Sequence, residues 1–231
     1  MRAINLMFHD VKIKPSRWNT TPERFIEIME RIATHPNKEK VTITVDDAGK
    51  GNHEFMLPIF EKYNFKATLF VPTQFISRGG NTSKYMTASQ IKEFSDMGHT
   101  IGSHSHSHPE NISLMSDSEI IFEWEKSKQI LEGITGKEVT QCSIPGGFYS
   151  KEQWQILANL GYQNIFNSVP TYKVYIESEM ELLGRFSIER NITMNHLNQI
   201  LSYNSYTQKR LFVRQKASQF LHTLKHRIKG S

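Results

Sequence analysis

Short apolar, β-branched segments alternate with longer amphipathic segments along this chain, and the alternation limits its fold more than any other property. The short segments resemble buried strands, and the longer ones carry apolar residues at helical spacing. The predicted strands cover residues 4–8, 41–45, 67–71, 98–102, 140–144, 162–167 and 182–188, and the predicted helices cover residues 22–32, 53–63, 87–97, 116–133, 151–160 and 193–201. Repeated strand–helix units favour a parallel sheet, so we expect an α/β fold, a distorted (β/α) barrel of about seven parallel strands.

The length and composition are those of one globular domain with a short tail. The chain has 231 residues, of which 38% are hydrophobic and 22% charged, which argues against a disordered or fibrous protein. We expect the domain at residues 1–205 and the tail at residues 206–231. The single cysteine, Cys142, excludes an internal disulfide framework and is expected to be buried in a strand.

The chain lacks the sequence patterns of secretion and membrane insertion. The apolar run near the N-terminus is too short for a signal peptide, and no stretch of about eighteen apolar residues could span a bilayer. These features predict a cytoplasmic location.

Positive charge is concentrated at the C-terminal end of the chain. No Asp or Glu follows Glu189, whereas eight Lys and Arg residues do, in a chain whose net charge is +5. Apolar residues at helical spacing within residues 213–228 predict a basic amphipathic helix, which could contact the anionic inner face of a membrane. The alternative is that its apolar stripe packs on the domain. Nucleic acid is not an expected partner, because no pattern of stacking aromatic and basic residues accompanies the charge.

Two polar clusters that follow predicted strands have the composition of a hydrolytic metal site. Asp46 and Asp47 end the strand at 41–45, and His104 and His108 come after the strand at 98–102. Adjacent residues at a strand end point to different sides. One Asp can therefore bind a divalent cation with the two imidazoles while the other accepts a proton. The pattern indicates a metal-dependent hydrolase, and the alternative for the Asp pair alone is a turn or a helix cap.

The spacing of the histidines allows two arrangements. His104 and His108 are four residues apart, which puts both side chains on one face of a helical turn. An extended segment would instead align His106 with them. Small polar neighbours and Pro109 favour the turn. His106 is then expected outside the set of metal ligands, either at the surface or hydrogen-bonded to a ligand.

The Asp and His motifs belong to a longer series. Residues 44–48 read Thr-Val-Asp-Asp-Ala, residues 104–108 read His-Ser-His-Ser-His, and residues 143–147 read Ser-Ile-Pro-Gly-Gly. In this order they resemble the motifs Thr-Phe-Asp-Asp-Gly, His-Ser/Thr-x-x-His and Arg-x-Pro-Tyr/Gly-Gly of the polysaccharide deacetylases of the NodB-homology type, carbohydrate esterase family 4. The resemblance extends over most of residues 4–190.

The resemblance implies a fold, a cofactor and a set of residue roles. The fold would be a distorted barrel, usually of seven strands, and the cofactor a divalent metal ion, commonly Zn²⁺. Carried over by position, Asp47, His104 and His108 would be the metal ligands and Asp46 the general base. The backbone N–H of Gly146 would donate to the oxyanion that forms during hydrolysis.

Two departures from the family pattern concern the base and the acid. Ser143 stands where many relatives have the Arg that fixes the base carboxylate, and residues 185–188 lack the His that serves as general acid in the fifth motif. We expect Arg185 to orient Asp46 or to bind an anionic group of the substrate, with a surface salt bridge as the alternative. His9, at the end of the first strand, is the candidate replacement acid, with a hydrogen-bonding or packing role as the alternative.

The expected substrate is an N-acetylated aminosugar in a polysaccharide or glycan precursor, as in capsule or exopolysaccharide assembly. Trp18, Tyr149 and Tyr172 are candidates for stacking on sugar rings, with packing as the alternative. Deformylation or another amide hydrolysis, on a lipid-linked or nucleotide-linked sugar, is an alternative within the same enzyme class. A metal-retaining carbohydrate-binding protein with impaired activity is the alternative outside it, because the third to fifth motifs are altered, the fourth lacking its Asp and Trp at residues 166–169.

Overall fold

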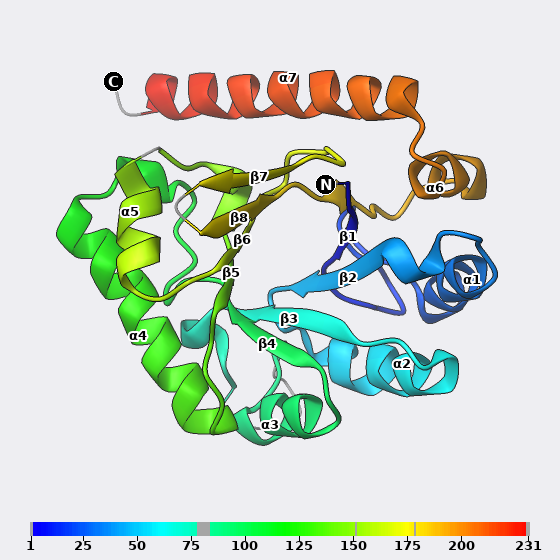
Figure 1. Cartoon of the computed structure of the whole chain (residues 1–231), viewed down its shortest axis with the longest axis horizontal. Coiled ribbons are helices and arrows are strands. Elements are labelled where there is room, and N and C mark those ends of the chain that lie inside the picture. The colour runs from blue at the N-terminus through cyan, green and yellow to red at the C-terminus, as the bar shows by residue number, and fades with distance from the viewer. Residues whose placement is uncertain (1, 78–83, 151, 178, 230–231) are drawn as a thin grey trace.

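The computed structural model describes residues 2–77, 84–150, 152–177 and 179–229, and in it helices surround a curled sheet (Figure 1). The strands are β1 (Ile4–Phe8), β2 (Val41–Asp46), β3 (Ala67–Val71), β4 (Thr100–Ser103), β5 (Gln141–Ser143), β6 (Asn164–Phe166), β7 (Val174–Glu177), β8 (Met180–Leu183) and β9 (Phe186–Ser187). Their order across the sheet is β7-β8-β6-β5-β4-β3-β2-β1-β9. Neighbouring strands are parallel, apart from β7 and β8, which form an antiparallel hairpin.

The expected (β/α) fold is confirmed as a curled sheet of parallel strands. The single strand expected at 182–188 is in fact two strands: β8 pairs with β6, next to the edge strand β7, and β9 pairs with β1 at the opposite edge of the sheet. Gly184 and Arg185 connect them. A Cβ at Gly184 would lie 2.3 Å from the carbonyl oxygen of Val169, so the crossing requires a residue without a side chain.

Helices cover the outside of the sheet, and their starts follow from the sequence. They are α1 (Pro22–Ala33), α2 (Leu57–Tyr63, preceded by a π-helical turn at Asn52–Met56), α3 (Ala88–Asp96), α4 (Asp117–Thr135), α5 (Glu152–Asn159), α6 (Met194–Leu201) and α7 (Ser205–Lys229). The Thr21 side chain accepts a hydrogen bond from the Arg24 amide, and Pro22 occupies the first helical position. Ser116 and Glu119 form the capping box expected at the start of α4.

The core lies between the sheet and the helices and fixes the strand ends. Strands β1 and β3 are buried along their whole length, as parallel strands covered on both faces are. The ring of Phe25 in α1 packs edge-on against Phe8 of β1 and Phe60 of α2, with centroid distances of 5.4 and 5.6 Å. Cys142 is buried in β5, as expected. This packing holds the carboxyl ends of the central strands in one fixed arrangement.

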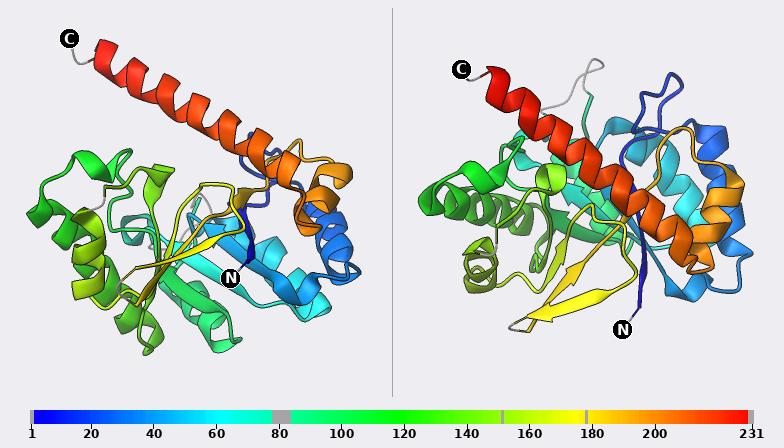
Figure 2. Two further views of the ribbon diagram at one scale, coloured as in Figure 1. Left: turned by 45° about the horizontal axis from the view of Figure 1, so that its top comes forward. Right: turned by 90° about the horizontal axis from the view of Figure 1, so that it is seen from above.

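The C-terminal tail forms α7, which lies across one side of the sheet (Figures 1 and 2). The Arg214 side chain donates to Glu189 at 3.1 Å, and the Gln215 side chain donates to the Ser168 hydroxyl at 2.8 Å. Glu189 and Ser168 follow β9 and β6, so these bonds attach the first half of α7 to the carboxyl end of the sheet. Within the described ranges, none of the helices has the length and apolar content needed to cross a bilayer.

Candidate metal centre and active site

Asp46 and Asp47 lie at the carboxyl end of β2 in different surroundings. Asp46 is the last residue of the strand and is buried. Asp47 has a positive φ of 75°, so the chain turns at once and the two side chains diverge. Asp46 therefore faces the interior of the barrel, while Asp47 is partly exposed beside the histidines.

The side chains of Asp47, His104 and His108 converge. Each offers one ligand atom, and these atoms lie within 4.8 Å of one another. Oδ1 of Asp47 is 3.7 Å from Nε2 of His104 and 3.5 Å from Nε2 of His108. The helical turn expected between the histidines is wrong, because Ser105 and His108 have positive φ values of 62° and 57°. An irregular loop after β4 brings the imidazoles together instead.

The donor atoms of this cluster suit a divalent cation. Oδ1 of Asp47 is buried and has no hydrogen-bond partner among the described residues. Nδ1 of His104 donates to the Ser143 carbonyl oxygen at 2.6 Å, which leaves the Nε2 lone pair facing Asp47. Burial lowers the pKa of His104 to about 4, so this imidazole is neutral, as a metal ligand must be. Two imidazoles and one carboxylate form a ligand set typical of catalytic zinc sites with open positions.

A buried carboxylate on α4 holds the loop that carries the histidines. Oε2 of Glu123 accepts hydrogen bonds from the backbone N–H groups of His106 at 2.9 Å and Ser107 at 2.7 Å. Its Oε1 accepts from the Ser107 hydroxyl at 2.7 Å. The His106 ring bonds through Nδ1 to the Thr73 hydroxyl at 2.7 Å. His106 thus lies outside the three-residue cluster, and Glu123 fixes the path of the backbone between the two other histidines.

Arg185 reaches Asp46 from the link between β8 and β9. It is 1% exposed, and its Nη1 and Nη2 donate to the two Asp46 oxygens at 2.6 and 2.8 Å. The remaining donors bond to the hydroxyls of Thr44 and Ser143 and to the carbonyl of Asn167. All five guanidinium N–H groups are used. The surface salt bridge considered for Arg185 is therefore wrong, and no N–H is left for an anionic substrate group.

The surroundings of Asp46 keep its carboxylate ionised. Burial alone would raise its pKa, but the guanidinium of Arg185 holds that pKa well below its ordinary value. The Ser143 hydroxyl also donates to Asp46, at 3.2 Å. Ser143 stands where the family pattern has an Arg, and its small side chain leaves room for the guanidinium of Arg185, which comes from the link between β8 and β9.

The three-residue cluster, Asp46 and Arg185 line a cavity of about 710 Å³ at the carboxyl ends of the strands. Gly146 is exposed in its wall, with a positive φ of 63°. His9 follows β1 into the cavity, and its Nδ1 is buried with no hydrogen-bond partner in the described part of the chain. The His9 ring lies 5.8 Å from that of Trp18. Helix α7 forms one side of the cavity through residues that include Leu211 and Arg214.

The aromatic residues considered for sugar contact lie in three different places. Trp18 is exposed at the edge of the cavity. Tyr149 lines a second cavity. Stacking by Tyr172 is wrong, because this residue is buried, its ring packs 4.6 Å from that of Phe186, and its hydroxyl donates to the Ile200 carbonyl.

Thr44, Glu123 and Asn167 contribute to the site and were not anticipated from the sequence. A signal existed for Glu123, because it stands on the apolar face of α4 beside Trp124, where an acidic residue needs partners. Asn167 accepts a hydrogen bond from Arg185 through its backbone carbonyl. Every residue has this group, so no residue type could have indicated the contact. Thr44 has the sequence pattern of an ordinary strand residue. Its hydroxyl contributes because it is buried beside Arg185 and accepts a hydrogen bond from it.

The similarity of the chain to known proteins agrees with this geometry. Residues 33–165 match the family model described as polysaccharide deacetylase. The chain is 30% identical over 133 residues to the peptidoglycan-N-acetylglucosamine deacetylase of Bacillus cereus, and 30% identical over 135 residues to the peptidoglycan-N-acetylmuramic acid deacetylase PdaA of Bacillus subtilis. These matches cover 55% and 57% of this chain but 44% and 48% of the relatives, so the chain spans about half of their length.

Solved structures share the fold. The Streptococcus pyogenes deacetylase PplD, solved in complex with acetate, is similar with a TM-score of 0.69 and 21% sequence identity, over 87% of this chain and 98% of that one. The family model covers more than half of the chain and includes the residues of both the Asp and the His motifs. This chain belongs to the polysaccharide deacetylase family.

Proposed function

We propose that the protein is a metal-dependent hydrolase that removes the N-acetyl group of an aminosugar in a polysaccharide or glycan precursor. This proposal rests on one feature of the site: the buried, ionised carboxylate of Asp46 shares a cavity with the cluster of Asp47, His104 and His108. Amide hydrolysis needs an activated water, a base for its proton and a donor for the oxyanion, and the cavity offers a group for each. Family membership supports deacetylation as the reaction.

Each of these groups has a role in the proposed mechanism. Asp47, His104 and His108 would hold the metal, for which Zn²⁺ is the first candidate, and a bound cation supplies a Lewis acid that activates water and polarises the acyl oxygen. Asp46 accepts a proton from the attacking water, and Arg185 keeps its carboxylate in one orientation. The Gly146 N–H donates to the oxyanion as the water adds to the acyl carbon.

His9 is the proposed source of the proton for the departing amine. Ser187 of β9 lies in the segment where the family pattern has its catalytic His, and it faces Met7 across the pairing of β9 with β1. His9 comes two residues after Met7, so it lines the same wall of the cavity as Ser187. Its ring is also close enough to contribute to the low pKa of Asp46. A base and an acid on either side of the scissile bond are what this chemistry requires.

An N-acetylated aminosugar is the substrate class that the surroundings support. Trp18 presents an aromatic face at the edge of the cavity, with the Arg17 guanidinium 4.4 Å from its ring centroid. Aromatic faces of this kind suit the C–H face of a pyranose. The two curated relatives are named for N-acetylglucosamine and N-acetylmuramic acid of peptidoglycan, which points to the same class of sugar.

Acetate release tests the proposal directly. The purified chain, loaded with Zn²⁺ or Co²⁺, should release acetate from acetylated chito-oligosaccharides. Asp46→Asn should lower the rate by about 10²–10⁴-fold without loss of bound metal. Asp96→Asn is the matched control, since Asp96 is exposed on α3. Release of formate from N-formylated sugars, without release of acetate from acetylated ones, would favour the deformylase alternative. Sugar binding with the metal retained but without turnover would favour the carbohydrate-binding alternative.

A further inference from the structure

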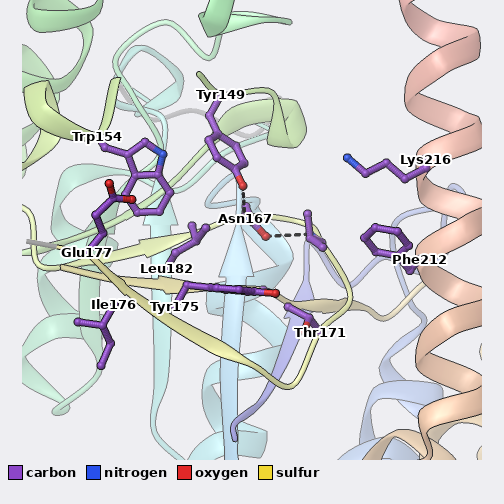
Figure 3. A pocket seen from close by; sticks show the side chains of 12 residues that line it. Tyr149, Trp154, Asn167, Thr171, Tyr175, Ile176, Glu177, Leu182, Phe212 and Lys216 are labelled. Carbon is purple, nitrogen blue, oxygen red and sulfur yellow. Dashed lines mark hydrogen bonds between the residues drawn. The ribbon is translucent and has the colours of Figure 1, made fainter. Parts of the chain in front are cut away.

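A second cavity, of about 520 Å³, lies between the β7–β8 hairpin, the segment after β6 and helix α7 (Figure 3). We call it the aromatic cavity, because its wall includes Tyr149, Trp154, Tyr175 and Phe212. Figure 3 shows the Tyr175 ring edge-on, with one face turned toward Tyr149, and Phe212 on the side of the cavity next to α7. The volume is within the range of small-molecule sites in proteins.

The aromatic cavity shares its walls with the catalytic cavity. The residues after β6 alternate between the two: Asn167 and Val169 line the aromatic cavity, and Ser168 and Pro170 line the catalytic one. Helix α7 does the same, with Phe212 in the first and Gln215 in the second. The Asn167 carbonyl accepts a hydrogen bond from Nε of Arg185 at 3.1 Å. The two cavities are therefore separated by a single extended chain segment.

The aromatic cavity is not simply an extension of the core. Tyr175 is 54% exposed and Phe212 is 40% exposed. Large apolar rings that face water on neighbouring elements are typical of ligand sites. Polar groups stand among them. Oδ1 of Asn167 accepts from the Val169 N–H at 2.9 Å, but its Nδ2 donates only a long bond of 3.5 Å to the Tyr149 hydroxyl, and Lys216 extends from α7 toward the cavity (Figure 3).

We propose that the aromatic cavity binds a pyranose unit of the same glycan chain whose N-acetyl group enters the catalytic cavity, an inference that rests on the proposed function. A pyranose has apolar C–H faces and a polar edge. The rings of Tyr175 and Phe212 offer flat apolar surface for the faces, while Asn167 and Lys216 offer hydrogen-bond donors for the edge hydroxyls. Longer glycans then gain affinity from a site that holds no metal ligand.

Calorimetry with oligosaccharides of two lengths tests this proposal. The metal-loaded Asp46→Asn chain, which does not consume its ligand, is titrated with the dimer and the pentamer of N-acetylglucosamine. We expect the pentamer to bind more tightly, because only the longer chain fills both cavities. Adding Tyr175→Ala and Phe212→Ala should raise the Kd of the pentamer by roughly tenfold. Val213→Ala is the control, since Val213 is 67% exposed on α7 and lines neither cavity.

The outcomes separate this proposal from the proposed function. Equal Kd values for pentamer and dimer would overturn it, as would unchanged pentamer binding after both ring substitutions. A failure of the deacetylase proposal has a different signature: the wild-type chain releases no acetate, while the ring substitutions still weaken pentamer binding. Neither substituted ring belongs to the buried core, so circular dichroism and thermal unfolding should show an intact fold.

Discussion

The guanidinium of Arg185 binds both carboxylate oxygens of Asp46, although 139 positions of the chain separate the two residues. The rings of Phe70 and Phe166 pack together, with centroids 5.1 Å apart, and lie beside the guanidinium at 5.5 and 5.9 Å from its central carbon. Both members of the pair are buried. Loss of one member of such a pair is costly, because the other charge is then left in the interior without a counter-ion.

Arg185→Met is expected to lower the free energy of unfolding by about 3–5 kcal/mol, because it leaves the Asp46 carboxylate buried and unpaired. The same change in an Asp46→Asn background should cost far less, since no charge is then stranded. Urea unfolding of the four metal-free proteins measures the coupling energy. An equal cost in both backgrounds would contradict the charge pairing as the source of the effect.

The strand–helix alternation was sufficient to predict the parallel sheet, but not this ion pair. Apolar residues recur on both sides of Gly184 and Arg185 between Leu182 and Ile188, and the whole segment was predicted as one strand. The structure breaks that strand at Gly184 and sends its second half to the opposite edge of the sheet. That break directs Arg185 onto Asp46. Local periodicity carries no information about which edge a strand joins, because that choice depends on contacts distant in sequence.

His108→Ala should weaken metal binding, whereas His106→Ala should leave it unchanged. Removal of the His108 ring takes away one of the three ligand atoms. Loss of a residue that only hydrogen-bonds to a ligand lowers metal affinity by roughly 10–100-fold, so loss of a ligand itself should lower Zn²⁺ affinity by more than that. His106→Ala removes a hydrogen bond to Thr73 and should leave the metal in place. Competition with a chromogenic zinc chelator measures both. Equal losses in the two variants would contradict the assignment of the ligands.

Glu123→Gln should weaken Zn²⁺ binding by about 10–100-fold, although Glu123 does not belong to the ligand cluster. The amide keeps the size of the side chain but replaces one acceptor oxygen, so either the backbone amides or the hydroxyl of the loop lose a partner. The same chelator competition applies. Glu125→Gln, an exposed change on the same helix, is the control, and equal affinities in the two variants would exclude a positioning role for Glu123.

The histidine loop shows a second limit of sequence-based prediction. The spacing of His104 and His108 indicated correctly that their side chains converge, but the helical turn invoked to explain it is absent. Glu123 binds the loop amides that would otherwise need partners within a turn. A spacing rule identifies which side chains meet, whereas the backbone path depends on a carboxylate from another element.

His99 should make the stability of the fold depend on pH below neutrality. This residue is buried between Phe60 and Phe94, its Nδ1 accepts from the Ala67 amide at 3.1 Å, and its Nε2 has no partner among the described residues. Burial, with a smaller contribution from Lys66, lowers its pKa from the ordinary 6.5 to about 4. Between these values the unfolded chain binds more protons at this position than the folded one does.

The stabilising contribution of neutral His99 is therefore complete above about pH 6.5 and decreases as the pH falls toward 4. His99→Asn retains an acceptor for the Ala67 amide but does not titrate. The difference in unfolding free energy between the wild type and this variant should shrink over that interval. Urea unfolding of the metal-free proteins at several pH values provides the measurement, and a difference that stays constant from pH 7 to 4 would contradict the prediction.

Flotation with lipid vesicles tests the prediction that α7 contacts the inner face of a membrane. Part of this helix faces the catalytic cavity, but Tyr206 and Val213 are exposed on it, and no acidic residue follows Glu189 to offset its basic residues. The full chain should float with anionic vesicles and not with neutral ones, and a chain ending at residue 204 should float with neither. Added salt should weaken the attachment, because charges are screened over about 10 Å at 0.1 M ionic strength. If the full and shortened chains float equally, or neither does, α7 is not a membrane anchor.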